Sequence, residues 1–360
     1  MSVKLQVAAG RSVEVTKSLV RDLGNLNGLH DITSMVAERP NLPTLISQIV
    51  NPVAQFLQTN TFEHDYTVYT QAMPSDKPYA ERGVVVDARP VTKTHLHKVP
   101  SFGVQAHIRP SDVLRRRKAG TADLLETMEA VVLEDMGGIS RGWDLFTEKS
   151  LAHAITTGTL YVPNGTVASV DFYQEYTGGA RPVVNYVLST TTVHPRKYGE
   201  EARRRILDNL LEGQQVDGFI ALCGTAFFDE LMSHPKWEQA MIDRSGIQGQ
   251  DPLIKRFENF SQQYRMFRGA DDILYIEYAG VIGGSPLIPA TEAYIMPVGA
   301  QGIFTEVFAP AETMGYVNTV AQREYMWRVD SVFDGVKLYS ESNKALFMIN
   351  PLLVQKCTKS

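Results

Sequence analysis

The 360-residue sequence predicts an α+β fold with a long, detached β-hairpin and an extended N-terminal segment. Three observations support this prediction. Segments with helically spaced apolar residues occur together with segments in which apolar and polar residues alternate. Two strand-like segments enclose a polar stretch, residues 73–83, that is rich in proline and charge. Residues 1–60 contain little apolar sequence that could close on itself, so we expect them to pack on something else.

The bulk composition is that of an ordinary globular protein, with 44% hydrophobic and 21% charged residues and length for roughly two domains. The net charge of −5 argues against a dedicated nucleic-acid-binding protein, which is usually basic. The two cysteines, Cys223 and Cys357, lie far apart and fit folding in a reducing cytoplasm. Because no apolar run approaches about 18 residues, we expect no membrane span, and the first residues do not resemble a signal peptide.

The N-terminal third predicts two short helices followed by the hairpin. Residues 12–28 and 41–60 have helical patterns, and prolines limit the second of them. Residues 64–71 alternate as a strand, and residues 82–97 are rich in β-formers. A hairpin of such polar composition has little core of its own, so it needs a partner surface.

A long helix is predicted next. Thr121 is a plausible N-cap, and the helical pattern resumes after Gly137 and Gly138 and ends at Gly158. The glycines, with Gly142, each cost about 1 kcal/mol relative to alanine, so we expect this helix to begin later or to bend there.

The rest of the chain predicts a compact α/β block and terminal strands. Helices are expected at 195–215, with Gly213 as the stop, and at 225–241, interrupted near Pro235. Strands are expected at 166–174, 216–224, 272–280, 292–299 and 303–312, with two or more within 324–357.

Three histidines on the return arm of the hairpin raise the possibility of a metal site. His95 and His97 lie two residues apart, so they share one face of a strand. A turn centred on Phe102 would place His107 opposite His97 and gather three imidazoles, a known zinc arrangement. However, residues 88–110 contain no aspartate or glutamate that could support such ligands. We therefore expect a polar hairpin face and no metal.

Other candidate chemistry is weak. Cys223 follows a predicted buried strand and is interpreted as a small core residue. The glycine-rich residues 281–289 lack dinucleotide-binding spacing, and no phosphate-binding or protease motif occurs. We expect neither an enzyme nor a cofactor. Two basic runs remain: residues 115–118 at the base of the hairpin, and residues 203–205, expected in the first turns of a helix. Each could be a solvated face or could bind carboxylates or phosphates of a partner.

The order of these segments resembles the major capsid protein E family of tailed phages, whose lambda-type coat proteins have the Hong Kong 97 type fold. The segments that carry the resemblance are IRPSDVLRRR, ISRGWDLFTEKSLAHAITTGTL, ARRRILDNLLEGQQVDGFIALCGTAFFDELMSHPKWEQAM and AYIMPVG. The resemblance covers most of the chain from about residue 60, and it rests on order and pattern more than on an invariant motif.

The resemblance implies a domain organisation. The expected parts are an N-terminal arm (1–60), an E-loop hairpin (61–115), a peripheral (P) domain with a spine helix (116–190 and 325–360), and an axial (A) domain (191–324). On this reading residues 99–108 form a bent return strand, so His107 need not meet His97.

The resemblance also implies a function. We expect a structural major capsid protein that assembles into hexamers and pentamers and encloses the double-stranded DNA of a tailed phage. Its expected partners are its own copies, a separate scaffolding protein, a portal, possibly a decoration protein, and the packaged DNA by non-specific contact. We expect assembly in the host cytoplasm and residence in the virion. The alternatives are an encapsulin-like compartment shell and a metal-dependent enzyme that uses the three histidines.

Subunit contacts are expected to include the following residues: His95, His97, Arg115, Arg116, Arg117 and Trp143. Imidazoles titrate near pH 6.5, so an interface that contains the two histidines could respond to mild acid.

Overall fold

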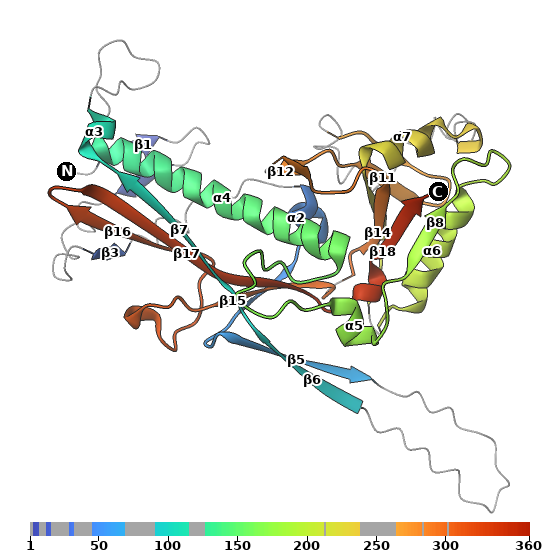
Figure 1. Cartoon of the computed structure of the whole chain (residues 1–360), viewed down its shortest axis with the longest axis horizontal. Helices are drawn as coiled ribbons and strands as arrows, with labels where there is room; N and C mark the ends of the chain where they lie inside the picture. Colours follow the sequence, from blue (N-terminus) through green and yellow to red (C-terminus); the bar gives the residue numbers. More distant parts are fainter. Residues whose placement is uncertain are drawn as a thin grey trace, which may run out of the picture.

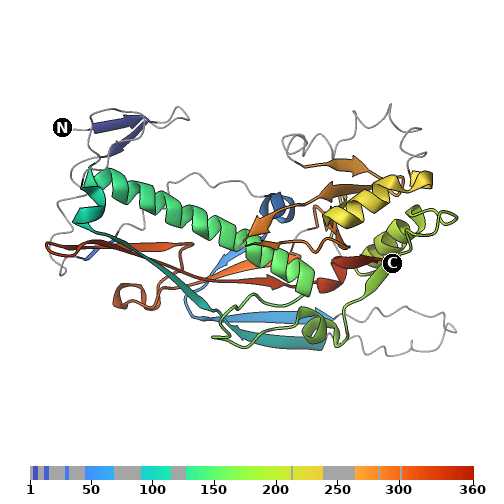
Figure 2. The ribbon, with the colours of Figure 1, turned by 45° about the horizontal axis from the view of Figure 1, so that its top comes forward.

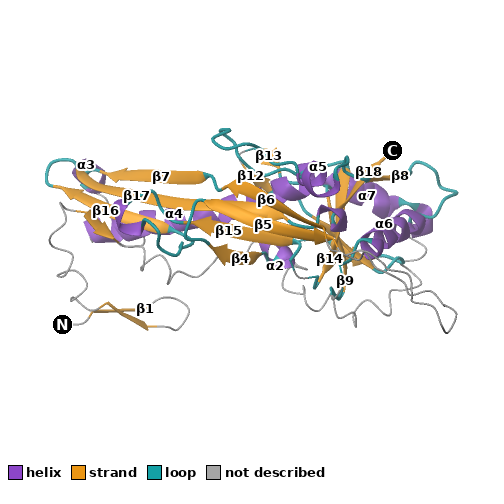
Figure 3. Ribbon diagram, turned by 90° about the horizontal axis from the view of Figure 1, so that it is seen from below, coloured by secondary structure: helices purple, strands orange, loops and turns teal. Residues whose placement is uncertain are grey.

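The computed structural model describes residues 45–68, 91–114, 127–211, 214–237, 264–282, 284–300 and 302–360, and the backbone of three short N-terminal strands. The molecule is elongated, with one sheet along its length and a second sheet gathered at one end (Figures 1 and 3). Helices and sheets occur in both parts, so the α+β prediction is confirmed.

The first sheet has the strand order β3-β16-β17-β15-β4, and β7 pairs in addition with β17. The strands are β3 (Leu29–Asp31), β4 (Val53–Phe56), β7 (Ser101–Ile108), β15 (Phe304–Ala309), β16 (Tyr325–Ser331) and β17 (Gly335–Met348). The 14-residue β17 is the central strand of this sheet, because it pairs with β7, β15 and β16 along its length. The long helix α4 (Met128–Thr157) runs along the same part of the molecule (Figure 1).

The second sheet has the order β10-β11-β9-β14-β18-β8. Its strands are β8 (Val183–Tyr186), β9 (Gly218–Cys223), β10 (Met266–Arg268), β11 (Ile273–Glu277), β14 (Glu292–Val298) and β18 (Gln355–Lys359). Helix α6 (Arg196–Asp208) packs against β8, β14 and β18, and α7 (Thr225–Ser233) packs against β11. The central strands are almost wholly buried, as their continuous apolar runs predict.

A separate two-stranded hairpin leaves the body (Figure 2). It is formed by β5 (Thr61–Val68) and β6 (Val91–Lys98), which pair with each other and with no other described strand. The remaining elements are short: β1 (Val3–Gln6), β2 (Ser12–Val15), α2 (Leu45–Val50), α3 (Pro110–Val113), α5 (Phe172–Thr177), β12 (Val281–Ile282), β13 (Ser285–Pro286), and the 3-10 turns η3 (Met314–Tyr316) and η4 (Pro351–Leu353).

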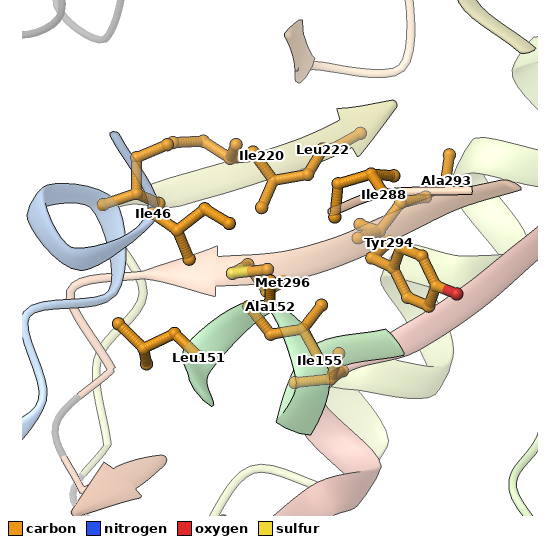
Figure 4. Packing of buried hydrophobic residues seen from close by; sticks show 14 of the residues in the cluster. Ile46, Leu151, Ala152, Ile155, Ile220, Leu222, Ile288, Ala293, Tyr294 and Met296 are labelled. Carbon is orange, nitrogen blue, oxygen red and sulfur yellow. The ribbon is translucent and has the colours of Figure 1, made fainter. Parts of the chain in front are cut away.

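Helix α4 joins the two parts of the molecule because its ends lie in different cores. Near its start, Val131 and Val132 pack with Leu338 of the first sheet. Near its end, Leu151 and Ile155 enter the large core that also holds the central strands of the second sheet (Figure 4). A rigid helix with both ends buried fixes how the two sheets sit relative to each other.

A buried carboxylate ties α2 into this core. Glu148 of α4 is 2% exposed and accepts hydrogen bonds from the backbone N–H groups of Ile46 (2.9 Å) and Ser47 (3.1 Å) and from the hydroxyl of Tyr278 (2.9 Å). The amide donors at the start of α2 have no partners within that helix, so the carboxylate satisfies them.

The predicted long helix is confirmed at its end and corrected at its start. Gly158 adopts a left-handed conformation (φ 76°) and closes α4, as predicted. The helix begins at Met128, with Thr127 rather than Thr121 as its N-cap, and runs without a break through the glycines at 137, 138 and 142. The expectation of a later start was wrong, because burial of the apolar side chains on the sheet outweighs the low helix propensity of glycine.

Several shorter predictions were also wrong. Residues 166–174 do not form a strand, because Asp171 caps α5 instead. Residues 12–15 of the expected first helix form the strand β2, and the second expected helix ends at Val50 and is followed by β4. Helix α6 ends at Asp208, short of Gly213, and it begins at Arg196, so the basic run 203–205 lies in its second half.

The two sheets cut across the predicted domain boundaries, which themselves stay a prediction. Strands β8 and β18 were assigned to the peripheral domain, but they pair with each other and β18 pairs with β14 in the second sheet. Strand β15 was assigned to the axial domain, but it pairs with β17 in the first sheet. Backbone hydrogen bonds between strands distant in sequence decide this division. Within the described residues, no helix is both long and apolar enough to cross a membrane.

Candidate functional site at the base of the hairpin

The hairpin β5–β6 presents one face of ring-bearing side chains to the body. The strands are antiparallel, with Phe62 opposite His97 and His64 opposite His95. Because side chains alternate along a strand, these four residues share a face. The opposite face is exposed and includes Leu96, which is 66% exposed.

Helix α5 supplies the body's side of this contact. Asp171 accepts hydrogen bonds from the backbone N–H groups of Tyr173 (2.9 Å) and Gln174 (3.1 Å), which starts the helix. Helix α5 has about one and a half turns, and it places Glu175 and Tyr176 against the hairpin.

One oxygen of Glu175 faces both histidines. Its Oε1 lies 2.7 Å from His95 Nδ1 and 3.1 Å from His97 Nε2. The side chains of Glu175, His95 and His97 are 22%, 15% and 8% exposed, respectively, so the cluster is largely removed from water. Sequence reasoning missed Glu175 because it lies about 80 residues further along the chain, directly after residues 166–174, which were expected to form a strand. The one local signal was Asp171, a good N-cap residue.

Burial shapes the titration of these groups. It lowers the pKa of His97, and the neighbouring His95 lowers this pKa further, while Glu175 opposes the shift. Burial and His95 likewise lower the pKa of His64. Both effects disfavour the imidazolium form, so His64 and His97 tend to be neutral near pH 7.

Aromatic stacking holds the hairpin's root to the first sheet. The ring of Phe347 on β17 stacks with Phe62 at 4.8 Å and with His97 at 5.1 Å between centroids. On α5, Tyr176 contacts the ring of His95 at 5.2 Å. One face of the base of the hairpin therefore packs against β17 and α5.

His107 does not join this cluster, so the arrangement of three histidines was wrong. Only β6 pairs with β5; the chain bends after Lys98, and β7 pairs with β17, where His107 lies opposite Lys337. Its Nε2 donates a hydrogen bond to the backbone carbonyl of Asp334 at 2.7 Å. The bent return strand matches the expectation drawn from the family resemblance.

Trp143 is buried within the chain. It is 4% exposed, and its indole N–H donates to the hydroxyl of Ser340 at 2.8 Å. The ammonium of Lys344 lies over the ring and donates to the carbonyl of Trp143 at 3.3 Å and to the hydroxyl of Thr147 at 2.6 Å. These contacts fasten α4 to β17; a role for Trp143 between subunits stays a prediction.

The two basic runs have different outcomes. Arg115, Arg116 and Arg117 lie outside the described residues. On α6, residues 203–205 each lie near a carboxylate of the same chain: Asp272, Glu200 and Glu201, respectively. Cys223 is wholly buried, which raises its pKa and keeps the thiol protonated, as the core interpretation predicted.

Exposed apolar side chains mark a second feature that the sequence did not signal. Val332 and Phe333 occupy the turn between β16 and β17 and are 93% and 92% exposed. In the loop before β16, Met314 is fully exposed and Val317 is 64% exposed. Adjacent, protruding apolar residues of this kind are typical of surfaces that another molecule covers.

Comparisons with known proteins agree with this fold. The sequence model of the family described as phage major capsid protein E matches residues 28–346. The major capsid protein of Pseudomonas phage KPP10 is 31% identical over 273 residues, which cover 72% of this chain and 76% of that protein. Among solved structures, a protein assigned as the capsid protein of a prophage of E. coli CFT073 has a TM-score of 0.57 at 12% identity, covering 88% of this chain and 93% of its own. The last similarity concerns the fold alone.

Proposed function

Since the chain belongs to the phage major capsid protein E family, and is thus a phage major capsid protein, we propose that its copies form the hexamers and pentamers of an icosahedral head. The family is one of structural proteins located in the virion, so we propose no catalytic activity. The matching relatives are phage capsid proteins, which favours a genome-containing head over an encapsulin-like compartment.

The observation that carries this proposal is the exposed apolar turn at residues 332–333. Two large side chains that are more than 90% exposed are unfavourable in a monomer, and burial in a neighbouring copy would stabilise them. Leu96, on the otherwise polar exposed face of the hairpin, is a further exposed apolar side chain that a neighbour could cover. A closed shell provides repeated interfaces that can bury both.

We infer the following roles from the family organisation: residues 1–60 as the N-terminal arm, 61–115 as the E-loop over a neighbour, 116–190 and 325–360 as the peripheral domain, and 191–324 as the axial domain. Sheet membership suggests moving β8 and β18 to the axial side and β15 to the peripheral side of this scheme. We also propose a separate scaffolding protein, a portal and a decoration protein as partners, non-specific contact with packaged DNA, and assembly in the host cytoplasm.

Light scattering and negative-stain microscopy of the purified full chain test this proposal. We expect hexamers, pentamers or closed shells that contain these capsomers. Protein that remains monomeric at high concentration, both alone and with a scaffolding protein added, would contradict self-assembly.

A further inference from the structure

We propose that His95, His97 and Glu175 bind a divalent cation of the zinc class, which links the hairpin to helix α5. The inference concerns a single chain and does not depend on assembly. The hairpin supplies two imidazoles and the body supplies one carboxylate, so a bound ion would join two elements that are about 80 residues apart in sequence.

The geometry fits such an ion. The three ligand atoms lie within 4.8 Å of one another, and the two nitrogens are 2.7 and 3.1 Å from the same carboxylate oxygen. Tetrahedral zinc, with bonds of about 2.0–2.2 Å, separates its ligand atoms by roughly 3.4 Å. An opening of less than about 1 Å at each contact would therefore admit the ion.

The ligand chemistry also favours zinc over magnesium. Two imidazole nitrogens and one carboxylate form a mixed nitrogen and oxygen set, which suits zinc, whereas magnesium prefers oxygen alone. Imidazole binds a metal in its neutral form, so binding should weaken as the pH falls. A water molecule would complete the four-coordinate shell.

Two buried ring nitrogens of these histidines lack a hydrogen-bond partner among the described residues. Although His97 Nε2 lies 3.1 Å from Glu175, it makes no hydrogen bond of acceptable geometry with any described residue, and the same holds for the buried Nε2 of His95. An unpaired buried nitrogen is costly. A cation held between His97 Nε2, His95 Nδ1 and the carboxylate would satisfy the first of these nitrogens.

Zinc titration of the purified full chain tests the site. The protein is stripped with a chelator and titrated with Zn²⁺ alone, and bound metal is measured by calorimetry and elemental analysis. We expect one saturable equivalent per chain. The variants His95→Gln, His97→Gln and Glu175→Gln should each weaken it by more than about tenfold, since even groups that only orient a ligand contribute about 10–100-fold. The matched control His107→Gln lies outside the cluster and should bind as the wild type does.

Two measurements on the wild-type chain keep the test independent of how the variants fold. X-ray absorption of the zinc-loaded protein should show two imidazole nitrogens and oxygen ligands. Hydrogen exchange should slow on zinc addition at residues 93–97 and 172–177 and stay unchanged in α6. Absence of a saturable equivalent, equal binding by wild type and Glu175→Gln, preference for Mg²⁺, or a shell without two imidazoles would each overturn the proposal.

Discussion

Replacing Phe333 by serine should impair assembly while leaving the folded chain as stable as before. The side chain is 92% exposed, so it contributes little to the intrachain core. Exposed substitutions of this kind change the free energy of unfolding by no more than about 0.5 kcal/mol. Burial of the same side chain between copies would stabilise each contact by about 1.5–3 kcal/mol.

That energy sets the size of the expected effect. Since about 1.4 kcal/mol corresponds to a tenfold change in an equilibrium constant, the association constant per contact should fall roughly 10–150-fold. Every subunit carries the turn, so the concentration at which shells appear should rise by at least about tenfold. Sedimentation velocity over a concentration series measures this threshold, and urea unfolding of the unassembled chain measures stability.

A conservative variant separates apolar burial from a general disturbance of the turn. Phe333→Leu keeps most of the apolar area and should assemble close to the wild-type threshold. If Phe333→Ser assembles at the same concentration as the wild type, the turn is not buried between copies. If its unfolding free energy instead falls by more than about 1 kcal/mol, the side chain acts within the chain.

Three further predictions concern the core and the long helix. Burial raises the pKa of Asp271 from 3.8 to about 6, so the folded chain binds this proton more tightly and its stability should fall as pH rises from about 4 to 6. The shift of about two pKa units corresponds to about 3 kcal/mol. Urea unfolding across this pH range should show that the unfolding free energy of Asp271→Asn falls less steeply than that of the wild type. Identical pH profiles for the wild type and Asp271→Asn would refute the assignment. Gly142→Ala on α4 adds a Cβ that meets no atom within 4 Å, so it should raise the unfolding free energy by about 0.5–1 kcal/mol. Gly199→Ala on α6 would place its Cβ 1.8 Å from Asp271 Oδ2, so it should lower the unfolding free energy by about 1–3 kcal/mol. Shifts of the same sign in the melting temperatures of both variants would contradict this. Glu148→Ala removes the acceptor for the first amides of α2 and should lower the unfolding free energy by about 1–3 kcal/mol. Glu148→Gln should give an intermediate value. If those amides stay protected from hydrogen exchange in Glu148→Ala, another group caps them.

Local patterns in the sequence determined much of the architecture. The buried strands β9, β11 and β14 and the helices α6 and α7 follow from continuous apolar runs and helical spacing. Gly158 ends α4 because only glycine readily adopts the left-handed conformation required there. The hairpin and the bent return strand followed from polar composition and from the order of segments shared with the capsid family.

Tertiary structure decided the features that depend on distant partners. Burial against the first sheet carries α4 through three glycines that the local pattern disfavours. Long-range strand pairing, rather than chain order, assigns β15 and β18 to their sheets. The site at the root of the hairpin depends on the same physics: His95 and His97 are visible in the sequence as neighbours on one strand face, but Glu175 reaches them only because α5 packs there. A search within the local sequence finds no carboxylate, since the partner is brought by the fold.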